Sequence, residues 1–257
     1  MPGVQPSDDP GVRAGESMTT QPLVRKLQQF VDLSTEELAT VNRLESTVVD
    51  VDRHAELIAE GEEKQQCYVI LDGWAACYKQ LADGRRQVIN FMIAGDFLGL
   101  RSLLLQVADH SATAVTPLRL GRFSAADLRR IMAEQPRVAS AILWALSRDE
   151  AIVVEHLVDV GRRNALERLA HFIIELGERL ALVGLADRHG YDCPLRQEDF
   201  ADALGLTAIH INRSFRQLRQ RGLADLAKRR MTVHDRAGLI ELAQFTDFYL
   251  APGSLPT

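Results

Sequence analysis

Residues 48–124 carry short apolar runs separated by glycine-containing turns, which is the pattern of a β-sheet domain. Each run is five to seven residues long and rich in β-branched or aromatic side chains, and the runs lie at 48–52, 67–71, 75–81, 87–93 and 118–123. Turn signals interrupt them at Glu60-Gly61-Glu62, Asp72-Gly73, Asp83-Gly84 and Gly95-Asp96. Short strands with Asp-Gly turns are typical of antiparallel sheets, so this region is predicted to form a sandwich or barrel.

The pattern on either side of this region is helical. Residues 22–47 read as two short helices, and Ser34 followed by Glu37 has the spacing of a capping box that begins the second one. Residues 125–185 are helical again, with Pro136 suited to the first turn of a helix and a further helix expected at 164–183. The segment 184–193 is predicted to be a loop.

Apolar positions in the helix after Pro136 fall on two faces. One face repeats at steps of four and three, as in a coiled coil, and comprises Ala139, Leu143, Leu146, Glu150, Val153, Leu157 and Val160. The other face comprises Val138, Ile142, Ala145 and Ile152. A helix that is apolar on two faces needs two partners, so we expect the sheet on one side and a second copy of the chain on the other. Burial of both faces within one subunit is the alternative.

Residues 197–206 have the pattern of a short helix followed by a tight turn. The positions of residues 197–204 that should face inward are Phe200, Ala201 and Leu204. Gly205 supplies the positive φ that a sharp turn between two helices needs, and Leu206 is the apolar side chain that fills the turn. This segment is therefore predicted to be the first half of a helix-turn-helix.

A second helix and a hairpin complete the pattern. Thr207 is a good N-cap, and the buried stripe of the helix is expected to consist of Ile211, Phe215 and Leu218. The segment 222–235 then reads as two short strands around a basic turn, Lys228-Arg229-Arg230. Helix, turn, helix and hairpin in this order indicate a winged helix-turn-helix.

Charge changes the interpretation of this segment. The whole chain has a formal net charge of −5, which by itself argues against a nucleic-acid partner. Residues 207–236, however, carry eight cations and two anions, a net charge of +6, which leaves −11 for the remainder. Such local asymmetry outweighs the total and favours a surface that binds DNA. A solvated basic helix face or a non-DNA scaffold protein is the alternative.

The side chains predicted to face outward have chemistry that reads DNA. Arginine pairs with guanine, asparagine with adenine, and a small apolar side chain contacts the thymine methyl, while the basic turn and a helix N-terminus hold phosphates. The predicted DNA contacts are Gln197, Thr207, Ala208, Ile209, His210, Asn212, Arg213, Arg216, Lys228, Arg229 and Arg230.

The stretch LRQEDFADALGLTAIHINRSFRQLRQRGL resembles the winged helix-turn-helix of the Crp/Fnr regulators, and the resemblance covers roughly residues 20–245. It implies an α+β fold: an antiparallel, jelly-roll-like β-roll, a long dimerisation helix and a C-terminal winged helix-turn-helix. It also implies a cytoplasmic homodimer that binds two-fold symmetric DNA and controls transcription with RNA polymerase. The expected divisions are 1–20 (disordered leader), 21–134 (roll), 135–162 (dimerisation helix), 163–245 (DNA-binding domain) and 246–257 (tail).

The resemblance also marks departures on the DNA-binding side. The family's third base-reading position falls on Arg213, which agrees with the family pattern. The two earlier positions fall on Ala208 and Ile209, so the usual Arg and Glu contacts are missing. Arg196 stands where many members carry a capping threonine.

The effector side departs further. Members that bind cyclic AMP carry a Gly-Glu pair for the ribose and an Arg-Ser pair for the phosphate, and here those pairs are Leu100-Arg101 and His110-Ser111. The pocket implied by the resemblance comprises Gly95, Asp96, Gly99, Leu100, Arg101, His110 and Ser111. Loss of the ribose carboxylate and of the guanidinium on the phosphate predicts that cyclic AMP is not the effector. A cyclic-nucleotide-responsive regulator with an atypical pocket is the alternative.

No cofactor, metal site or catalytic centre is predicted. Residues 1–20 contain no cysteine for an iron–sulfur cluster, and the three cysteines at 67, 77 and 193 match no zinc spacing. Cys77 and His54 are conceivable haem ligands, but isolated residues of these types in a sheet are usually structural. A metal-dependent enzyme built on a β-roll would need clustered histidines and carboxylates, which the sequence lacks. No apolar run approaches about 18 residues, so no membrane span is expected.

Overall fold

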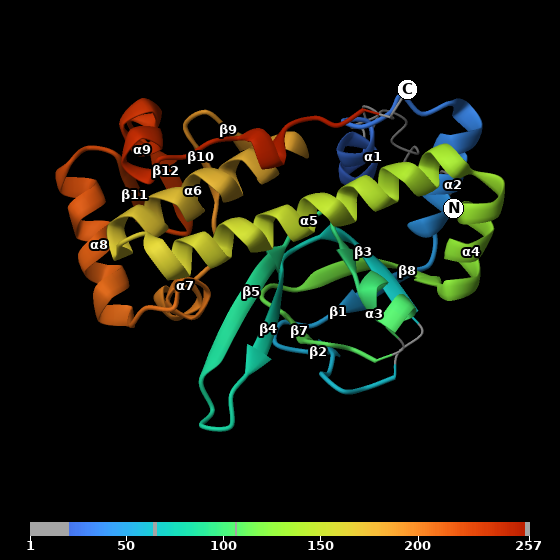
Figure 1. Cartoon of the computed structure of the whole chain (residues 1–257), viewed down its shortest axis with the longest axis horizontal. Helices are drawn as coiled ribbons and strands as arrows, with labels where there is room; N and C mark the ends of the chain where they lie inside the picture. The colour runs from blue at the N-terminus through green and yellow to red at the C-terminus, as the bar shows by residue number, and fades with distance from the viewer. Residues whose placement is uncertain (1–20, 64–65, 106, 255–257) are drawn as a thin grey trace, which may run out of the picture.

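The computed structural model describes residues 21–63, 66–105 and 107–254, which form a β-roll, a long helix and a winged helix-turn-helix. The helix α5 runs the length of the molecule, with the roll against one half and the DNA-binding elements against the other (Figure 1). The predicted α+β fold class is confirmed. The expected leader at 1–20 and the last three residues of the expected tail lie outside the described residues.

Two short helices precede the roll, as predicted. They are α1 (Pro22–Leu27) and α2 (Thr35–Leu44). The capping box is present: the Glu37 backbone N–H donates to Ser34 Oγ at 3.2 Å, and the Ser34 N–H donates to the Glu37 carboxylate at 2.7 Å.

The roll consists of two four-stranded antiparallel sheets. One has the order β1-β8-β3-β6, from Val48–Val51, Leu118–Ser124, Gln66–Asp72 and Phe97–Leu98. The other has the order β2-β7-β4-β5, from Glu56–Ile58, Ser111–Ala114, Ala75–Gln80 and Arg86–Met92. All five predicted strands are confirmed. The strands β2, β6 and β7 were not predicted, because each has four residues or fewer and too few apolar side chains to form a run.

Three helices follow the roll strands or lie between them: α3 (Leu100–Leu105), α4 (Ala125–Glu134) and α5 (Pro136–Arg162). Pro136 begins α5, as predicted. With 27 residues at about 1.5 Å each, α5 is about 40 Å long. Its buried apolar face consists of Val138, Ala141, Ile142, Ala145 and Ile152, which confirms the face that was expected to meet the body of the subunit.

The C-terminal domain has the predicted helix-turn-helix and hairpin. Its helices are α6 (Ala165–Leu182), α7 (Gln197–Leu204), α8 (Ala208–Gln220) and α9 (Arg236–Ala243). Its sheet has the order β11-β12-β10-β9, from Ala224–Ala227, Arg230–Val233, Gly190–Asp192 and Ala186–Asp187. The helix α9 was not anticipated.

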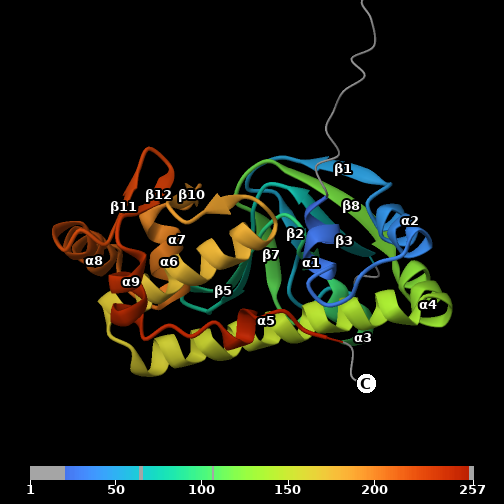
Figure 2. The same cartoon turned by 90° about the horizontal axis from the view of Figure 1, so that it is seen from above.

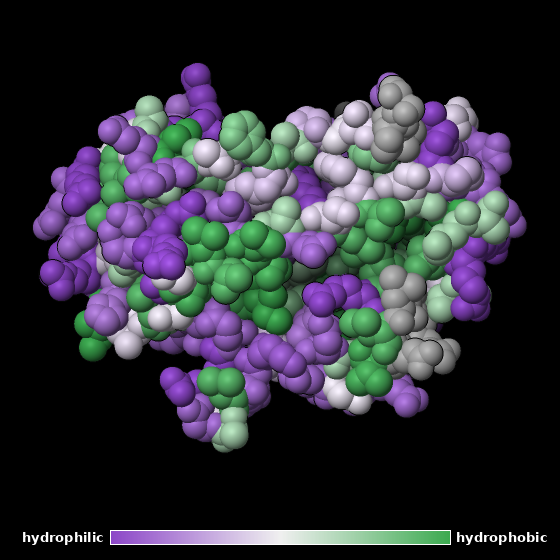
Figure 3. Space-filling view, viewed as in Figure 1, coloured by the Kyte–Doolittle hydropathy of each residue, from purple (hydrophilic) through white to green (hydrophobic). Residues whose placement is uncertain are grey.

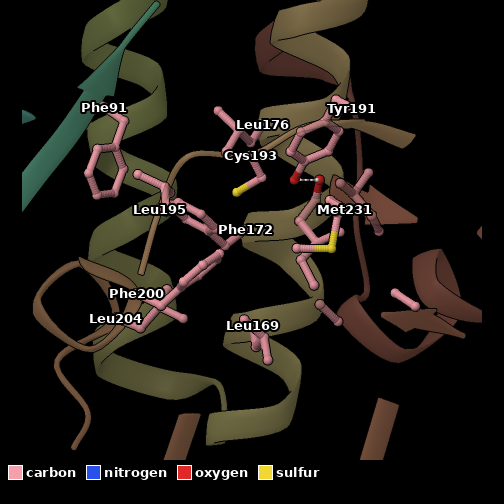
Figure 4. Packing of buried hydrophobic residues seen from close by; sticks show 14 of the residues in the cluster. Phe91, Leu169, Phe172, Leu176, Tyr191, Cys193, Leu195, Phe200, Leu204 and Met231 are labelled. Atoms are coloured by element: carbon pink, nitrogen blue, oxygen red, sulfur yellow. Dashed lines mark hydrogen bonds between the residues drawn. The ribbon is translucent and has the colours of Figure 1, made fainter. Parts of the chain in front are cut away.

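Aromatic rings connect the roll to the DNA-binding helices. The rings of Phe91, Phe172, Phe200 and Phe215 meet edge to face in succession, with centroids 5.2–6.0 Å apart. Figure 4 shows three of these rings in the same core as Tyr191, whose hydroxyl donates to the Ile173 carbonyl at 3.0 Å. The core is therefore continuous from β5 in the roll to α8.

The prediction of a loop before the helix-turn-helix is wrong. Residues 184–193 were expected to form a loop, yet β9 and β10 form a hairpin there that extends the wing sheet. Charged residues in this segment hid the strand, while Tyr191 anchors it in the core. Within the expected tail, Phe248–Leu250 forms a 3₁₀ turn.

The C-terminal segment returns along α5 toward the N-terminal helices (Figure 2). The Tyr249 ring stacks on His171, with centroids 6.3 Å apart, and the Tyr249 hydroxyl lies 3.4 Å from the Glu175 carboxylate. Further along, a side chain at Gly253 would collide with Trp144, since its Cβ would lie 2.4 Å from the indole nitrogen. The segment therefore contacts both halves of the molecule.

Buried charges also join the two halves. The Arg179 guanidinium on α6, 5% exposed, donates to Asp96 at 3.1 Å and to the Phe91 carbonyl at 2.6 Å in the roll. Lys26 on α1 donates to the same Asp96 at 2.7 Å. Burial alone would raise the pKa of Asp96, but Lys26 and Arg179 outweigh it and lower the pKa, so this carboxylate stays charged.

Glu175 and His156 extend this network across α5. The Glu175 carboxylate lies 3.5 Å from Arg179 and 3.0 Å from His156 Nε2, while His156 Nδ1 lies 3.0 Å from the Ile89 carbonyl. Burial opposes charge on His156, but Glu175 outweighs it and raises the pKa of the imidazole. The roll, α5 and α6 are thus joined by charges and hydrogen bonds as well as by apolar packing.

Candidate nucleic-acid interface

The helix α8 is positioned by a tight turn and a cap. Gly205 adopts φ +62°, and Thr207 Oγ1 accepts the His210 backbone N–H at 3.3 Å. Ile211, Phe215 and Leu218 are all buried, which confirms the predicted stripe. Because these three side chains fix the rotation of the helix, Asn212, Arg213 and Arg216 on the opposite side face solvent.

The outward face of α8 carries donors that have no partner in the described part of the chain. Ile209, His210, Asn212, Arg213 and Arg216 are exposed, and Ala208 is half-buried. Arg213 and Arg216 form no ion pair or hydrogen bond with any described residue. Their guanidinium groups remain available for carbonyl and ring-nitrogen acceptors or for phosphates.

The wing carries two further cations on a strained turn. Ala227 pairs with Arg230, so Lys228 and Arg229 form a two-residue hairpin turn, with φ of 50° and 61°. Such turns favour Asn-Gly because both residues need positive φ. Lys228 and Arg229 are exposed and have no ionic partner among the described residues, whereas Arg230 lies 3.1 Å from Asp192. The positive φ of both residues costs conformational free energy, and it places two unpaired cations at the tip of the turn. Backbone strain of this kind is typical of functional sites.

The start of α7 lies on the same domain. Gln197 is its first residue and is exposed. Arg196 is its N-cap residue and offers no side-chain oxygen to cap the helix, while the Arg196 backbone N–H donates to the Asp199 carboxylate at 2.8 Å. Arg86 of the roll pairs with Asp199 at 3.2 Å and with Asp202 at 2.5 Å, so α7 is also tied to the roll.

Not every cation of the basic segment is available. Arg219 is paired with Asp225 at 2.6 Å, and Arg236 with Glu178 at 2.7 Å. Of the cations in this segment without a partner in the described chain, Arg213 and Arg216 lie on the outward face of α8, and Lys228 and Arg229 lie at the tip of the wing. Positive charge is therefore concentrated where a groove and its flanking phosphates would lie.

At the roll, an acid lies between the two residues expected to face an effector. Asp109 pairs with Arg101 at 2.7 Å through one oxygen, and its other oxygen lies 2.8 Å from His110 Nδ1. Burial raises the pKa of Asp109, but the hydrogen bond to His110 and the charge of Arg101 outweigh it and lower the pKa. The Asp109 carboxylate thus already neutralises Arg101 and His110, and a phosphate would have to take its place.

Of the other residues expected in the effector pocket, Gly99 and Leu100 precede Arg101 and Ser111 follows His110, whereas Gly95 and Asp96 contact other elements. Asp96 lies in the interdomain charge network, not with Arg101, and Gly95 (φ +88°) lies against the backbone of Pro22. Gly99 also has positive φ, Leu100 is buried, and Ser111 Oγ accepts the Glu60 N–H at 3.0 Å. The space between the sheets is filled by an apolar cluster that includes Ile70, Met92, Leu98 and Leu118.

The outer face of α5 is an apolar surface on the subunit. Leu143 is 64% exposed and Leu157 is 73% exposed, and Val153, Val154, Val158 and Val160 are exposed as well. In the space-filling view an apolar patch lies over α5 (Figure 3). Leu146, which was expected in this surface, is half-buried and packs into the subunit core. Glu150 is exposed within the surface, as expected for the interruption.

Within the described residues, no three His, Cys, Asp or Glu side chains are placed to hold a metal ion. Cys67, Cys77 and Cys193 are buried, and burial raises the pKa of each thiol to about 12. Nor does any helix in the described ranges have the length and apolar character to cross a membrane.

A winged helix-turn-helix whose second helix presents unpaired donors defines a class of DNA-binding proteins. Residues 48–135 match the cyclic nucleotide-binding domain family, and residues 167–242 match the Crp-like helix-turn-helix domain family. The chain belongs to the Crp/Fnr family of transcription regulators; it is a DNA-binding regulator, not an enzyme.

Relatives support this assignment along most of the chain. The nitrogen fixation regulation protein FixK of Bradyrhizobium diazoefficiens is 34% identical over 177 residues, covering 68% of this chain and 73% of FixK. The transcriptional activator protein FnrL of Cereibacter sphaeroides is 28% identical over 213 residues, covering 81% of this chain and 85% of FnrL. The solved structure of FixK2 from Bradyrhizobium japonicum is 26% identical, with a TM-score of 0.70 over 78% of this chain and 98% of FixK2.

Sequence reasoning did not find Asp109 or the contacts between the roll and α7. Asp109 precedes His110 directly, so the sequence alone places these two residues together. The pairing of Asp109 with Arg101, however, depends on how α3 packs against β7. The contact of Arg86 with Asp199 and Asp202 joins residues more than 110 positions apart, and no local pattern marks it.

Proposed function

We propose that this regulator binds two-fold symmetric DNA as a homodimer and reads each half-site with α8. The residues assigned to the DNA interface are those predicted from the sequence: Gln197, Thr207, Ala208, Ile209, His210, Asn212, Arg213, Arg216, Lys228, Arg229 and Arg230. The observation that carries the proposal is the set of exposed donors on α8 that have no partner within the described chain.

The division of labour follows from position. Arg213 lies one turn into α8, where its planar guanidinium can pair with the O6 and N7 of guanine in the major groove. Lys228 and Arg229 lie at the tip of a hairpin beside the helix, where the DNA backbone is the nearer partner. Arg213 therefore supplies base preference, whereas the wing supplies affinity that does not depend on sequence.

The outer face of α5 is the proposed dimer surface. Its exposed leucines and valines form an apolar strip along a helix, and an equivalent strip on a second copy would cover it. Leu143, Val153 and Leu157 form its centre, with Leu146 at its inner edge. Two copies related by a two-fold axis would present two α8 helices to successive major grooves.

The proposed setting is the cytoplasm, and RNA polymerase is the proposed partner for transcription control. Both rest on family membership and on the regulatory names of relatives such as FnrL. No effector is assigned. The two donors expected at the effector pairs are already engaged, because Asp109 pairs with both Arg101 and His110.

Cyclic AMP is expected not to bind at physiological concentrations. A nucleotide phosphate would have to displace the Asp109 carboxylate from His110, and Arg101 stands where a carboxylate would hold the ribose. Isothermal titration with the full chain should show no heat of binding above that of dilution. A micromolar Kd, together with tighter DNA binding in the presence of cyclic AMP, would contradict this expectation.

The experiment that tests the proposed function is selection of bound duplexes from a random DNA pool, followed by two variants measured on the selected site. Arg213→Ala should cost about 1–3 kcal/mol per half-site and relax the preference at one base pair. The measurement is fluorescence anisotropy against every single-base variant of the site at several salt concentrations.

Arg229→Gly is the matched change on the wing. Glycine suits the positive φ at this position, so the variant should be as stable as the parent or more stable, by up to about 1 kcal/mol. Its affinity should nevertheless fall for all sequences alike, and the salt slope should drop by about one per lost phosphate contact, about two per dimer. If Arg213→Ala leaves base preference intact, α8 does not read the half-site as proposed.

A further inference from the structure

The exposed isoleucine at the start of α8 needs a physical account. Ile209 is 80% exposed, although its β-branched side chain is among the most apolar of all residues. The exposed apolar residues of α5 have a common explanation in a second subunit. Ile209 lies on a different surface, beside His210 and Asn212, with unpaired cations one and two turns further along.

Ile209 lies on the same face of α8 as the side chains proposed to read the bases. Asn212 and Arg213 follow it by three and four residues, so all three lie on one face of the helix. Four residues of α-helix span about 6 Å, which is on the order of two base-pair steps. A groove that receives Arg213 therefore brings Ile209 within about two base pairs of the base that Arg213 contacts.

The chemistry of base edges then restricts what Ile209 can read. The C5 methyl of thymine is the apolar group that a base presents in the major groove, whereas the cytosine amino group calls for a carboxylate acceptor. Residues 208–220 contain no aspartate or glutamate. We propose that Ile209 is a specificity-determining residue that packs on a thymine methyl in each half-site, within about two base pairs of the base read by Arg213. This inference rests on the proposed DNA-binding function and deepens it.

The side chain suits this task. Isoleucine has a restricted χ1, so little rotamer freedom is lost when it meets a partner. Burial of one methyl group is worth about fourfold in affinity, and two half-sites together about fifteenfold. Ala208, which precedes it, is half-buried and too short to reach as far into the groove.

The test removes the methyl group and leaves every hydrogen-bonding group in place. In the selected duplex, each thymine within two base pairs of the Arg213 contact is replaced in turn by deoxyuridine in both half-sites. Binding of the parent dimer should weaken about fifteenfold at one such position. Ile209→Ala should bind the thymine duplex more weakly than the parent and should bind the thymine and deoxyuridine duplexes equally.

A gain-of-contact arm tests the same methyl from the other direction. Replacing that T·A pair with C·G should weaken binding by the parent, and 5-methylcytosine in place of cytosine should restore part of the loss, but not for Ile209→Ala. The control is Asn212→Ala, which should weaken binding and yet retain the full penalty for deoxyuridine.

The outcomes separate this inference from the proposed function. If no deoxyuridine substitution affects the parent more than Ile209→Ala, the inference is wrong, while a lost base preference in Arg213→Ala would still support reading by α8. If neither variant alters base preference, both the inference and the proposed function fail.

Discussion

Arg179→Met is expected to lower the free energy of unfolding by about 3–5 kcal/mol. Arg179 is almost fully buried and serves Asp96 and Glu175 at once, together with the Phe91 carbonyl. Methionine fills a similar volume but leaves buried Asp96 with Lys26 as its remaining close cation and buried Glu175 with His156 alone. Urea unfolding at a fixed protein concentration measures the effect, since dimer stability depends on concentration.

Arg236→Met is the matched control, because Arg236 forms an exposed pair with Glu178 on the same domain. Exposed pairs contribute between zero and about 1 kcal/mol, so the control should change little. Arg179→Lys should fall between the two, since it keeps the charge but loses the fork that reaches several acceptors at once. Equal costs for Arg179→Met and Arg236→Met would show that the buried network does not hold the two halves together.

Substituting Leu143 and Leu157 with glutamate is expected to yield a folded monomer whose DNA affinity falls about 100-fold or more. Both leucines are largely exposed on the subunit, so the change should scarcely affect its fold, but in a dimer it would bring carboxylates together on an apolar surface. A monomer contacts one half-site only, so it loses the gain in affinity that comes from binding two linked sites, which is about 10²–10⁴-fold. Sedimentation velocity and anisotropy on the selected site measure the two effects.

Leu81→Glu provides the control for this pair. Leu81 is also an exposed leucine, but it lies at the tip of the β4–β5 hairpin, away from α5 (Figure 1). Its substitution should leave the dimer and its DNA affinity unchanged. An undisturbed dimer in the Leu143 and Leu157 variant would mean that subunits meet through another surface.

The parts of the fold that sequence predicted well are those with local, periodic signals. The stripe of Ile211, Phe215 and Leu218 repeats over two turns, and the caps at Ser34 and Thr207 depend on neighbours three residues away. The short strands of the roll and of the β9–β10 hairpin lack such repetition. The helix α9 had a readable start, Asp235 capping the Gly238 N–H at 3.0 Å, but the strands immediately before it obscured the change of period.

In the candidate site, too, the residues marked by local patterns could be predicted and those set by distant contacts could not. The outward side chains of α8 could be named because burial of one face of this helix fixes the other. Asp96 was assigned to an effector pocket by resemblance, whereas its carboxylate is committed to Lys26 and Arg179, which lie 70 positions before it and 83 after it. Partners that distant are set by the assembled fold, and the sequence around Asp96 carries no sign of them.

The return of the C-terminal segment along α5 gives the chain two crossings between its halves instead of one. The first crossing is the α5–α6 corner at Arg163, and the second is the stretch from Phe245 to Gly253, held by Tyr249 and seated against Trp144. A domain that the chain joins to the rest of the molecule at one point can rotate about that point. A domain joined at two separated points resists such rotation. Reorientation of α8 relative to the roll therefore requires residues 245–253 to separate from α5, so this stretch helps to hold the DNA-binding domain in place.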